Sequence, residues 1–437
     1  MQFTQAVGKE QESISQRIAF FEYLYVFVLI IYAGRANVFV QSLTFKTNII
    51  GYFLPILLSG IMVLRWKVKI DSRFFYLLLG FAIYFLALSL KYKEIHPSFL
   101  ISNYLIFFTV YAATRSLKFK LFKIYEYLIF FLAIIGLFGW LIQIALRGDH
   151  LYFLLNKIPG IALFSYVSGD GINAVFYSVQ PAYSSMLYGF AVPRNCGYAW
   201  EPGAFAVYLC LAIFINLFCT DYDKNKKKRL WFLVLALLST QSTTGYLIFM
   251  LIILFYFLNK NLKIVLLFLP FVTVALVYVA TLPFMSKKVI DLIDETKNVD
   301  VLIERTIGLE GEFTPQRFTS FVITFKDFQN NPLFGLGPRR EDSWTVKLYS
   351  NISAISGIGE LLAGFGLTGF IFFIILSFRT SVLFSKTFNY KGKILLFLII
   401  IFISISYSII FLPLVMCFWM FQLFEPEDIN KQMLKPV

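Results

Sequence analysis

The stretch that decides the fold is "LWFLVLALLSTQSTTGYLIFMLIILFYFLN", residues 230–259. At about thirty residues it is too long for one membrane helix and short for two. Basic residues flank it on both sides, "KKKR" (226–229) before it and Lys260 after it. Because positively charged segments stay on the cytoplasmic side, the chain has to enter and leave on that side. We therefore predict two helices of about 14 residues, each roughly 21 Å long, against a hydrocarbon core of about 30 Å.

The tip of this predicted hairpin is the polar segment "STQSTTG", residues 239–245. Two short helices would leave it below the outer surface of the membrane. Irregular polar backbone at that depth is tolerated only where it lines a cavity or is packed in protein. We therefore predict a polar pocket that opens outward, with Ser239, Ser242 and Thr243 on its floor. The alternative is a turn whose hydroxyl groups are satisfied by neighbouring helices.

Apolar windows of similar kind recur along the whole chain. It has 437 residues, of which 59% are hydrophobic and only 15% are charged. This composition predicts an all-α polytopic membrane protein with one transmembrane domain, residues 1–437, and excludes a soluble core. With two further spans in 394–424, divided at Pro413, the total is about twelve spans. The other candidate spans lie at about 18–34, 48–64, 74–90, 99–114, 121–146, 202–220, 262–282 and 355–378.

The net charge of +14 is a topology signal and argues against a nucleic-acid partner. Basic clusters fall in every second connection, for example "RWKVKIDSR" (65–73) and "RSLKFKLFK" (115–123). By the positive-inside rule these connections and both termini face the cytoplasm. Two long connections then face outward, 147–201 and 283–354.

The second external loop is predicted to carry two amphipathic helices. Residues 284–307 suit a helix that lies at the membrane interface. The other helix is predicted to have Thr314 as its N-cap and Pro315 as its first residue. A stripe at helical spacing follows, which we interpret as packing against the membrane domain. Its members are Phe318, Phe321, Phe325 and Phe328.

A candidate anion site lies in "RNCGYAWEPGAF", residues 194–205, just before an apolar span. With Pro202 as the first helical residue, Arg194 and Glu201 lie outside the N-terminus, where unpaired N–H groups favour anions. Arg317 falls in the first turn of another helix, where a cation opposes the helix dipole unless an anion lies between them. Two such outward arginines predict a clamp for phosphate groups. The alternative is that each pairs with a local acid or lies among lipid headgroups.

Arg339 and Arg340, after the glycine turn "NPLFGLGPRR", add further cations. Glu360, a few residues inside the next span, is also a candidate, because ionisable groups in spans are costly and suggest function. Glu22 and Glu126 also lie within predicted spans and are candidates for the same reason, but no motif surrounds them. Two histidines and four cysteines give no plausible metal site or disulfide framework, so neither a metal nor a cofactor is expected.

"R-x-x-G-x-x-x-E-P-G-x-F" followed by "STQSTTGY" resembles the O-antigen polymerase (Wzy) family. So does "NPLFGLG" leading to "GELLAGFGLTGF" (359–370), and the motifs are shared with O-antigen ligases. The resemblance spans about 190–375. It departs from the family at the position eleven residues after each arginine, where Phe205 and Phe328 stand in place of glycine.

The resemblance implies a GT-C-like membrane glycosyltransferase in the bacterial inner membrane. Its substrate would be an undecaprenyl-pyrophosphate-linked glycan, polymerised on the periplasmic face, and a chain-length regulator is a further candidate partner. A glycosyl pyrophosphate carries a good leaving group, so Arg194 and Arg317 would stabilise the developing charge without a metal. Glu201 is the leading general base. The alternative, which is compatible with it, is a helix-start carboxylate paired with Arg194. Arg339, Arg340, Ser239, Ser242, Thr243 and Glu360 are assigned to substrate binding. An O-antigen ligase and a lipid-linked oligosaccharide flippase remain as alternatives.

Overall fold

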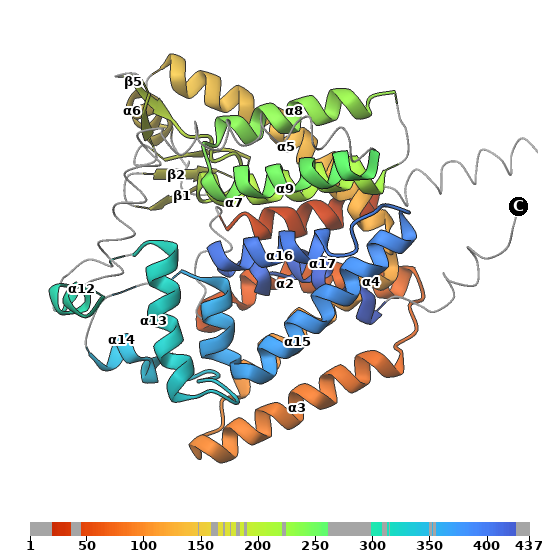
Figure 1. The fold of residues 1–437 in the computed structure, drawn as a ribbon, viewed down its shortest axis with the longest axis vertical. Helices are drawn as coiled ribbons and strands as arrows, with labels where there is room; N and C mark the ends of the chain where they lie inside the picture. The colour runs from red at the N-terminus through yellow and green to blue at the C-terminus, as the bar shows by residue number, and fades with distance from the viewer. Residues whose placement is uncertain are drawn as a thin grey trace, which may run out of the picture.

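The protein is mostly helical in the computed structural model (Figure 1). Among its described residues, six helices are long and apolar enough to cross a membrane. They are α3 (Ser72–Tyr92), α4 (Pro97–Leu117), α5 (Lys120–Ala145), α7 (Pro202–Phe214) with its π-helical extension η2 (Ile215–Cys219), α9 (Thr243–Lys260) and α15 (Gly357–Thr387). The structure describes residues 20–35, 45–146, 148–158, 165–168, 171–174, 176–180, 184–187, 190–220, 224–260, 299–307, 313, 315–348, 352 and 355–424.

Further helices complete the bundle. They are the first helix Phe20–Ala33, α2 (Phe45–Arg65), α8 (Lys226–Ser239), α16 (Leu395–Ser406) and α17 (Pro413–Phe424). The structure is consistent with the expected all-α membrane class, but it does not establish twelve spans. The predicted span at 262–282 lies outside the described residues.

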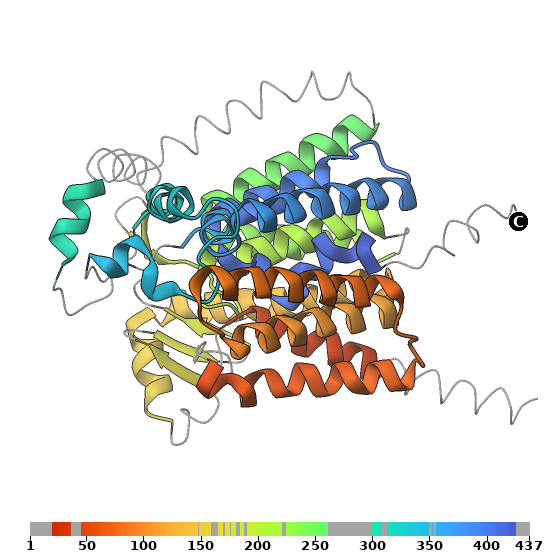
Figure 2. The same ribbon diagram turned by 90° about the horizontal axis from the view of Figure 1, so that it is seen from below.

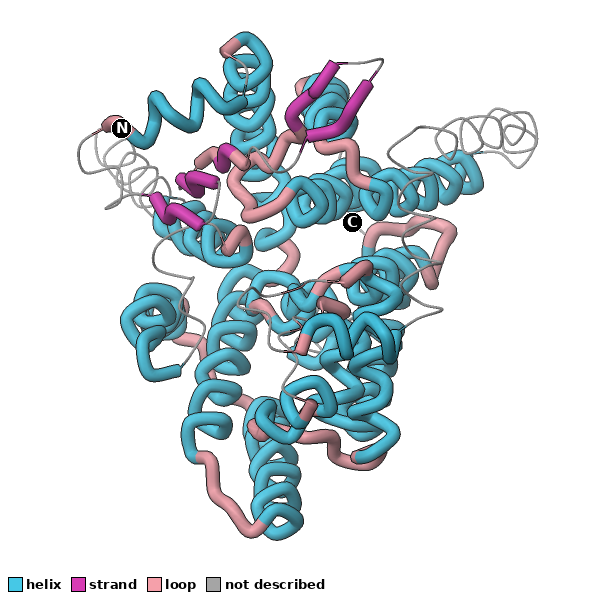
Figure 3. Tube along the Cα trace, turned by 90° about the vertical axis from the view of Figure 1, so that its left-hand side faces the viewer, coloured by secondary structure: helices cyan, strands magenta, loops and turns pink. Residues whose placement is uncertain are grey.

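The short helices and strands between the spans gather at one end of the bundle, which we call the loop end (Figures 1 and 2). Figure 3 faces this end. It carries α6 (Gly148–Asn156), α12 (Val299–Thr306), α13 (Arg317–Asn330), η3 (Arg340–Asp342) and α14 (Trp344–Lys347). Among the described residues it also carries five short strands, which were not predicted from the sequence. They are β1 (Ser165–Ser168), β2 (Gly171–Ala174) and β3 (Ser178–Val179) in one antiparallel sheet, and β4 (Ser184–Leu187) and β5 (Phe190–Pro193) in another.

Both divided stretches form helical hairpins, as predicted. The stretch 230–259 is α8 and α9, joined by a turn at 240–242. Helix α8 has the expected 14 residues, but α9 has 18, so only one of the two helices is as short as predicted. The stretch 394–424 is α16 and α17, joined by η4 (Ser408–Phe411), with Pro413 as the first residue of α17. Twelve residues make a helix of only about 18 Å, so α16 and α17 are short against a hydrocarbon core of about 30 Å. The two hairpins meet at their tips, where the hydroxyl oxygens of Thr244 and Ser406 are 2.9 Å apart.

Helix α15 is broken at Gly366, whose φ of 63° and ψ of −161° are not helical. The glycine turn after α13 fits into this break through backbone hydrogen bonds. The N–H of Leu336 donates to the Ala363 carbonyl at 2.7 Å, and the N–H of Leu367 donates to the Pro332 carbonyl at 2.8 Å. Gly335 takes a left-handed φ of 69° to allow this approach. The two segments that carry the second sequence resemblance, 331–337 and 359–370, are therefore one structural unit.

We expect Gly335→Ala to destabilise this unit. A Cβ at Gly335 would lie 2.5 Å from the Gly364 carbonyl carbon, which is backbone and cannot move aside easily. The left-handed φ adds its own penalty, so the loss in free energy of unfolding should be about 2 kcal/mol or more. Thermal unfolding of the purified protein measures it. Gly364→Ala is the matched control, because a Cβ there meets nothing within 4 Å, and equal unfolding temperatures for the two variants would contradict the prediction.

The prediction for helix α13 was wrong in two respects. The helix begins at Arg317 with Gln316 as its N-cap, two residues later than expected. The phenylalanine stripe is also not its packing face, since Phe318 is 50% exposed and the other three rings are partly exposed. Polar residues fill the packed face because local hydrogen bonds satisfy them, as when the N–H of Trp344 donates to Asp327 at 2.6 Å. The buried residues of α13 are Thr319, Ser320, Ile323, Thr324 and Asp327.

The two membrane-embedded acids have basic partners. Glu126 in α5 and Arg229 in α8 form a buried ion pair of 2.9 Å. Asn216, in the π-helical η2, donates to the same carboxylate oxygen of Glu126 at 2.7 Å. Glu22 in the first helix pairs with Lys120 at the start of α5. These acids therefore hold helices together.

The predicted interface helix at 284–307 is described only over its last part, α12.

Candidate functional site

The N-terminus of α7 places Glu201 at the loop end. Pro202 is the first helical residue, as predicted, and Glu201 is the N-cap with extended backbone. Its side chain makes no capping hydrogen bond and instead reaches the first residue of α13. The Nη2 atom of Arg317 donates to both carboxylate oxygens of Glu201, at 2.9 and 3.1 Å. This pair joins the two long connections across 116 positions of sequence.

Tyr407, in the turn after α16, lies under this ion pair. The Cζ atom of Arg317 is 4.9 Å from the centroid of the Tyr407 ring. Gly203 leaves room for the phenol, because a Cβ at that position would overlap the Tyr407 hydroxyl. Burial and the Glu201 carboxylate raise the pKa of Tyr407, while Arg317 and Arg194 lower it. The phenol therefore stays protonated and uncharged, next to the charged groups of Glu201, Arg317 and Arg194.

Arg194 is held at the tip of the α8–α9 hairpin. Its Nε donates to the Thr240 carbonyl at 3.1 Å. Its neighbour Asn195 fixes the segment by donating from its backbone to the Ser239 carbonyl at 3.0 Å and from its side chain to the Ser239 hydroxyl at 2.8 Å. Within the described part of the chain, Arg194 has no carboxylate within ion-pair distance. The sequence left open that Glu201 pairs with Arg194, but the structure pairs it with Arg317.

The hydroxyl groups of the hairpin tip have local roles. Ser239 donates to the Ala236 carbonyl at 2.8 Å, and the Ser242 hydroxyl accepts the N–H of Gly245 at 3.3 Å. Thr243 begins α9 and is partly buried. The side-chain oxygen of Gln241, at the centre of the turn, is buried without a hydrogen-bond partner among the described residues. The Ser239 and Ser242 hydroxyl groups are therefore satisfied locally, as the alternative expected, and the outward pocket stays a prediction. The amide of Gln241 is a group that sequence reasoning missed.

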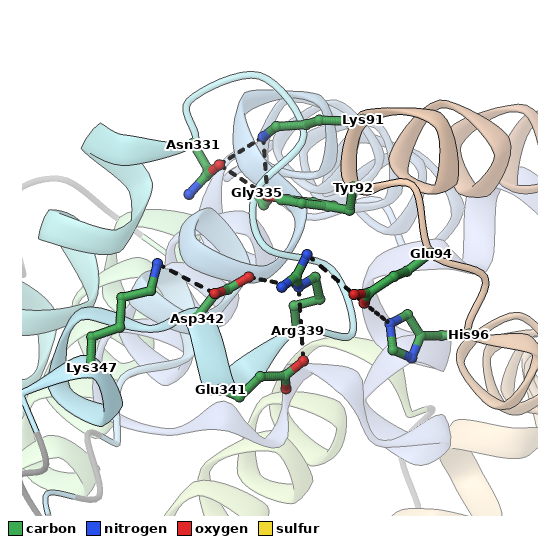
Figure 4. Close-up of polar contacts among 10 residues, drawn as sticks. All are labelled: Lys91, Tyr92, Glu94, His96, Asn331, Gly335, Arg339, Glu341, Asp342 and Lys347. Carbon is green, nitrogen blue, oxygen red and sulfur yellow. Dashed lines mark hydrogen bonds and ion pairs between the residues drawn. The ribbon is translucent and has the colours of Figure 1, made fainter.

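Arg339 belongs to a separate ion cluster (Figure 4). Its Nε is 2.6 Å from Asp342, and its guanidinium lies 3.8 Å from Glu341 and from Glu94 in the turn between α3 and α4. Its Cζ atom is also 5.1 Å from the ring centroid of Tyr92. Three acids thus surround this cation, and it ties α3 to the segment after α13. No described contact links Arg339 to the Glu201–Arg317 pair.

The remaining candidates are placed as follows. Glu360 lies in the first turn of α15, where Ser356 caps the helix by accepting the N–H of Gly359 at 3.2 Å. Arg340 is in η3, and its side chain lies outside the described part of the structure. Tyr407 was missed by sequence reasoning, although its place between two short spans was a signal that could have found it. Over the described residues, no group of three or more His, Cys, Asp or Glu side chains could hold a metal ion.

One comparison with known proteins bears on this geometry. Residues 230–374 match the family model described as O-antigen ligase. The match starts in α8, includes the hairpin tip, Arg317 and the glycine turn, and ends in α15. It supports the O-antigen ligase/polymerase superfamily, whose members are glycosyltransferase-like ligases and polymerases, without distinguishing between the two. No curated protein matches the chain.

Proposed function

We propose that the protein is a glycosyltransferase that polymerises undecaprenyl-pyrophosphate-linked oligosaccharide repeat units on the periplasmic face of the bacterial inner membrane. The observation that carries this proposal is the Arg317–Glu201 pair, at 2.9 Å, together with Arg194, which bonds to the tip of the α8–α9 hairpin and acts on the same Tyr407 as the pair. Cations and one carboxylate at a helix start are the groups that transfer from a glycosyl pyrophosphate requires.

The arginines act on the leaving group. Arg194 and Arg317 bind the pyrophosphate and stabilise the charge that develops as the bond from the anomeric carbon to the phosphate oxygen breaks. The positive end of the α7 dipole adds to this field. Arg339, Arg340 and Glu360 would contact the glycan farther along the loop end, and Ser239, Ser242 and Thr243 would support the floor. A chain-length regulator remains a candidate partner.

Glu201 acts on the acceptor. A sugar hydroxyl of the second glycan attacks the anomeric carbon, and its proton passes to the Glu201 carboxylate. The pyrophosphate leaves as the anion on its lipid. Because Glu201 and the pyrophosphate both bind Arg317, donor binding weakens the hold of Arg317 on Glu201 and frees the carboxylate to accept the proton. The base thus becomes available only when a donor is in place.

Ligation of the glycan to lipid A-core is the second candidate function, favoured by the description of the matching family. It uses the same donor and the same chemistry at the leaving group. The two functions differ in the acceptor, a second lipid-linked glycan or a lipid A-core.

The chain-length profile of the surface polysaccharide tests the proposal in host cells that carry the wild type, a gene deletion or Arg194→Ala. We expect the deletion to leave single repeat units, and Arg194→Ala to lose most long chains because one phosphate contact is gone. Arg379→Ala, an exposed arginine in α15 far from the site, should behave as the wild type. Long chains that accumulate on the lipid carrier in the deletion would indicate a ligase instead. Repeat units trapped in the cytoplasm, or an unchanged profile, would refute both functions.

A further inference from the structure

Arg35 follows the first helix and is tied to the segment that contains Glu201. The carbonyl of its neighbour Gly34 accepts the N–H of Trp200 at 3.0 Å. The carbonyl of Ala33 accepts the hydroxyl of Tyr208, in α7, at 2.6 Å. Arg35 itself has a left-handed φ of 49°. The end of the first helix is therefore fixed against both sides of the α7 N-terminus, and Arg35 has a defined place there.

The guanidinium of Arg35 is stacked but not fully hydrogen-bonded. Its Cζ atom is 5.8 Å from the centroid of the Trp200 ring. Its Nε is buried and has no hydrogen-bond partner among the described residues. A buried N–H without an acceptor is unfavourable, so its persistence in a folded protein calls for an explanation. An anion bound at this arginine would supply the acceptor.

Aromatic rings connect Arg35 to the ion pair of the candidate site. The Trp200 ring meets the Tyr407 ring edge-on, with centroids 6.4 Å apart. Arg35 lies over Trp200, and Arg317 lies over Tyr407. Trp200 also directly precedes Glu201 in the chain. Two arginines thus stack on two touching rings, which places Arg35 and Arg317 on neighbouring parts of one surface.

Arginines are the main charged groups described on this surface. Among the ion pairs of the described residues, only the Arg317–Glu201 pair joins a site arginine to an acid. Arg35 lies over Trp200, the residue before Glu201, and Arg194 and Arg317 both act on Tyr407, so three guanidinium groups lie around this pair of rings. A ligand with two or more negative charges would balance them, and planar donors suit its phosphate oxygens.

We infer that Arg35 is a third arginine of the anion site and that it makes the site selective for a diphosphate over a single phosphate. The inference rests on the proposed function and extends it, since neither the motifs nor the family match, which begins at residue 230, includes Arg35. Arg35 contacts one phosphate group through its free Nε–H, while Arg194 and Arg317 hold the other. Trp200 keeps the guanidinium oriented.

Binding of inorganic pyrophosphate and of inorganic phosphate to the purified full-length protein tests this inference. We expect Arg35→Ala to raise the Kd for pyrophosphate roughly ten- to a hundredfold, the effect of one charge-assisted hydrogen bond. The Kd for phosphate should change much less, so the preference for pyrophosphate should fall. Arg35→Lys keeps the charge but not the Nε–H, and should restore only part of the affinity. Farnesyl pyrophosphate serves as a second, lipid-linked probe.

Arg115→Ala is the matched control, because this arginine also lies over a ring, Tyr111 at 6.0 Å, but pairs with Asp71 away from the site. It should bind both anions as the wild type does. If Arg35→Ala binds pyrophosphate normally while Arg317→Ala does not, the role of Arg35 is refuted and the proposed function stands. If Arg35→Ala raises the Kd for pyrophosphate and the Kd for phosphate by the same factor, diphosphate selectivity is refuted. If the wild type binds neither pyrophosphate nor farnesyl pyrophosphate, the proposed function itself fails.

Discussion

Arg317→Ala is expected to abolish long-chain polysaccharide and to slow glycan transfer by at least about a hundredfold, the usual effect of losing one donor to a developing charge. The change removes a cation from the leaving group and also leaves Glu201 buried without its partner. Without Arg317 the carboxylate also loses the two hydrogen bonds that position it, so the placement of the general base is lost together with the clamp. The rate of glycan transfer by the purified enzyme and the chain-length profile in cells both measure this effect.

Two further variants separate the clamp from the base. Arg317→Lys keeps a point charge near Glu201 but loses the planar donor, and should recover only part of the rate. Glu201→Gln keeps the size of the side chain and removes the base, so it should bind pyrophosphate as well as the wild type but transfer slowly. Near-normal transfer by Arg317→Ala, in protein that is folded by size-exclusion chromatography, would remove Arg317 from the mechanism.

Arg229→Ala is expected to have the largest effect on stability. Glu126 is fully buried and Arg229 is 3% exposed, so removal of the cation strands a carboxylate inside the bundle. Breaking a buried pair from one side typically costs about 3–5 kcal/mol. The loss should appear as a much lower thermal unfolding temperature or as failure to accumulate in the membrane.

The double variant Glu126→Leu with Arg229→Leu provides the control for this prediction. It removes both charges at once, and replacing a buried pair by apolar residues is often neutral. We therefore expect it to be more stable than Arg229→Ala alone. If the single variant unfolds at the wild-type temperature, the ion pair contributes nothing and Glu126 has another role.

Local sequence features predicted the elements that depend on local physics. The basic residues around 230–259 and Pro413 in 394–424 correctly gave two hairpins, because the lengths of spans and the placement of charge are fixed along the chain. Pro202 likewise marked the first residue of α7. The short strands at 165–193 were missed because segments such as "SYVS" and "GINA" are too short to show an alternating pattern.

Pairing across the fold could not be predicted. The sequence suggested that Arg194, Glu201 and Arg317 act together, but tertiary packing decides that Glu201 pairs with Arg317 and that Arg194 binds the Thr240 carbonyl. The prediction that the phenylalanine stripe of α13 packs against the membrane domain was wrong for the same reason. Apolar spacing shows which residues share a helix face, and it does not show which face the rest of the protein covers.

The buried pair between α5 and α8 has a consequence for biogenesis. Glu126 is synthesised 103 residues before Arg229, so α5 leaves the ribosome long before its partner exists. During that interval the carboxylate has no arginine, and its place near the start of α5, beside a basic connection, lets it stay near water. Only when α8 is inserted can the pair form and be buried. Closure of α8 onto α5 is thus a late step of assembly, and the hairpin tip that holds Arg194 is set in place with it.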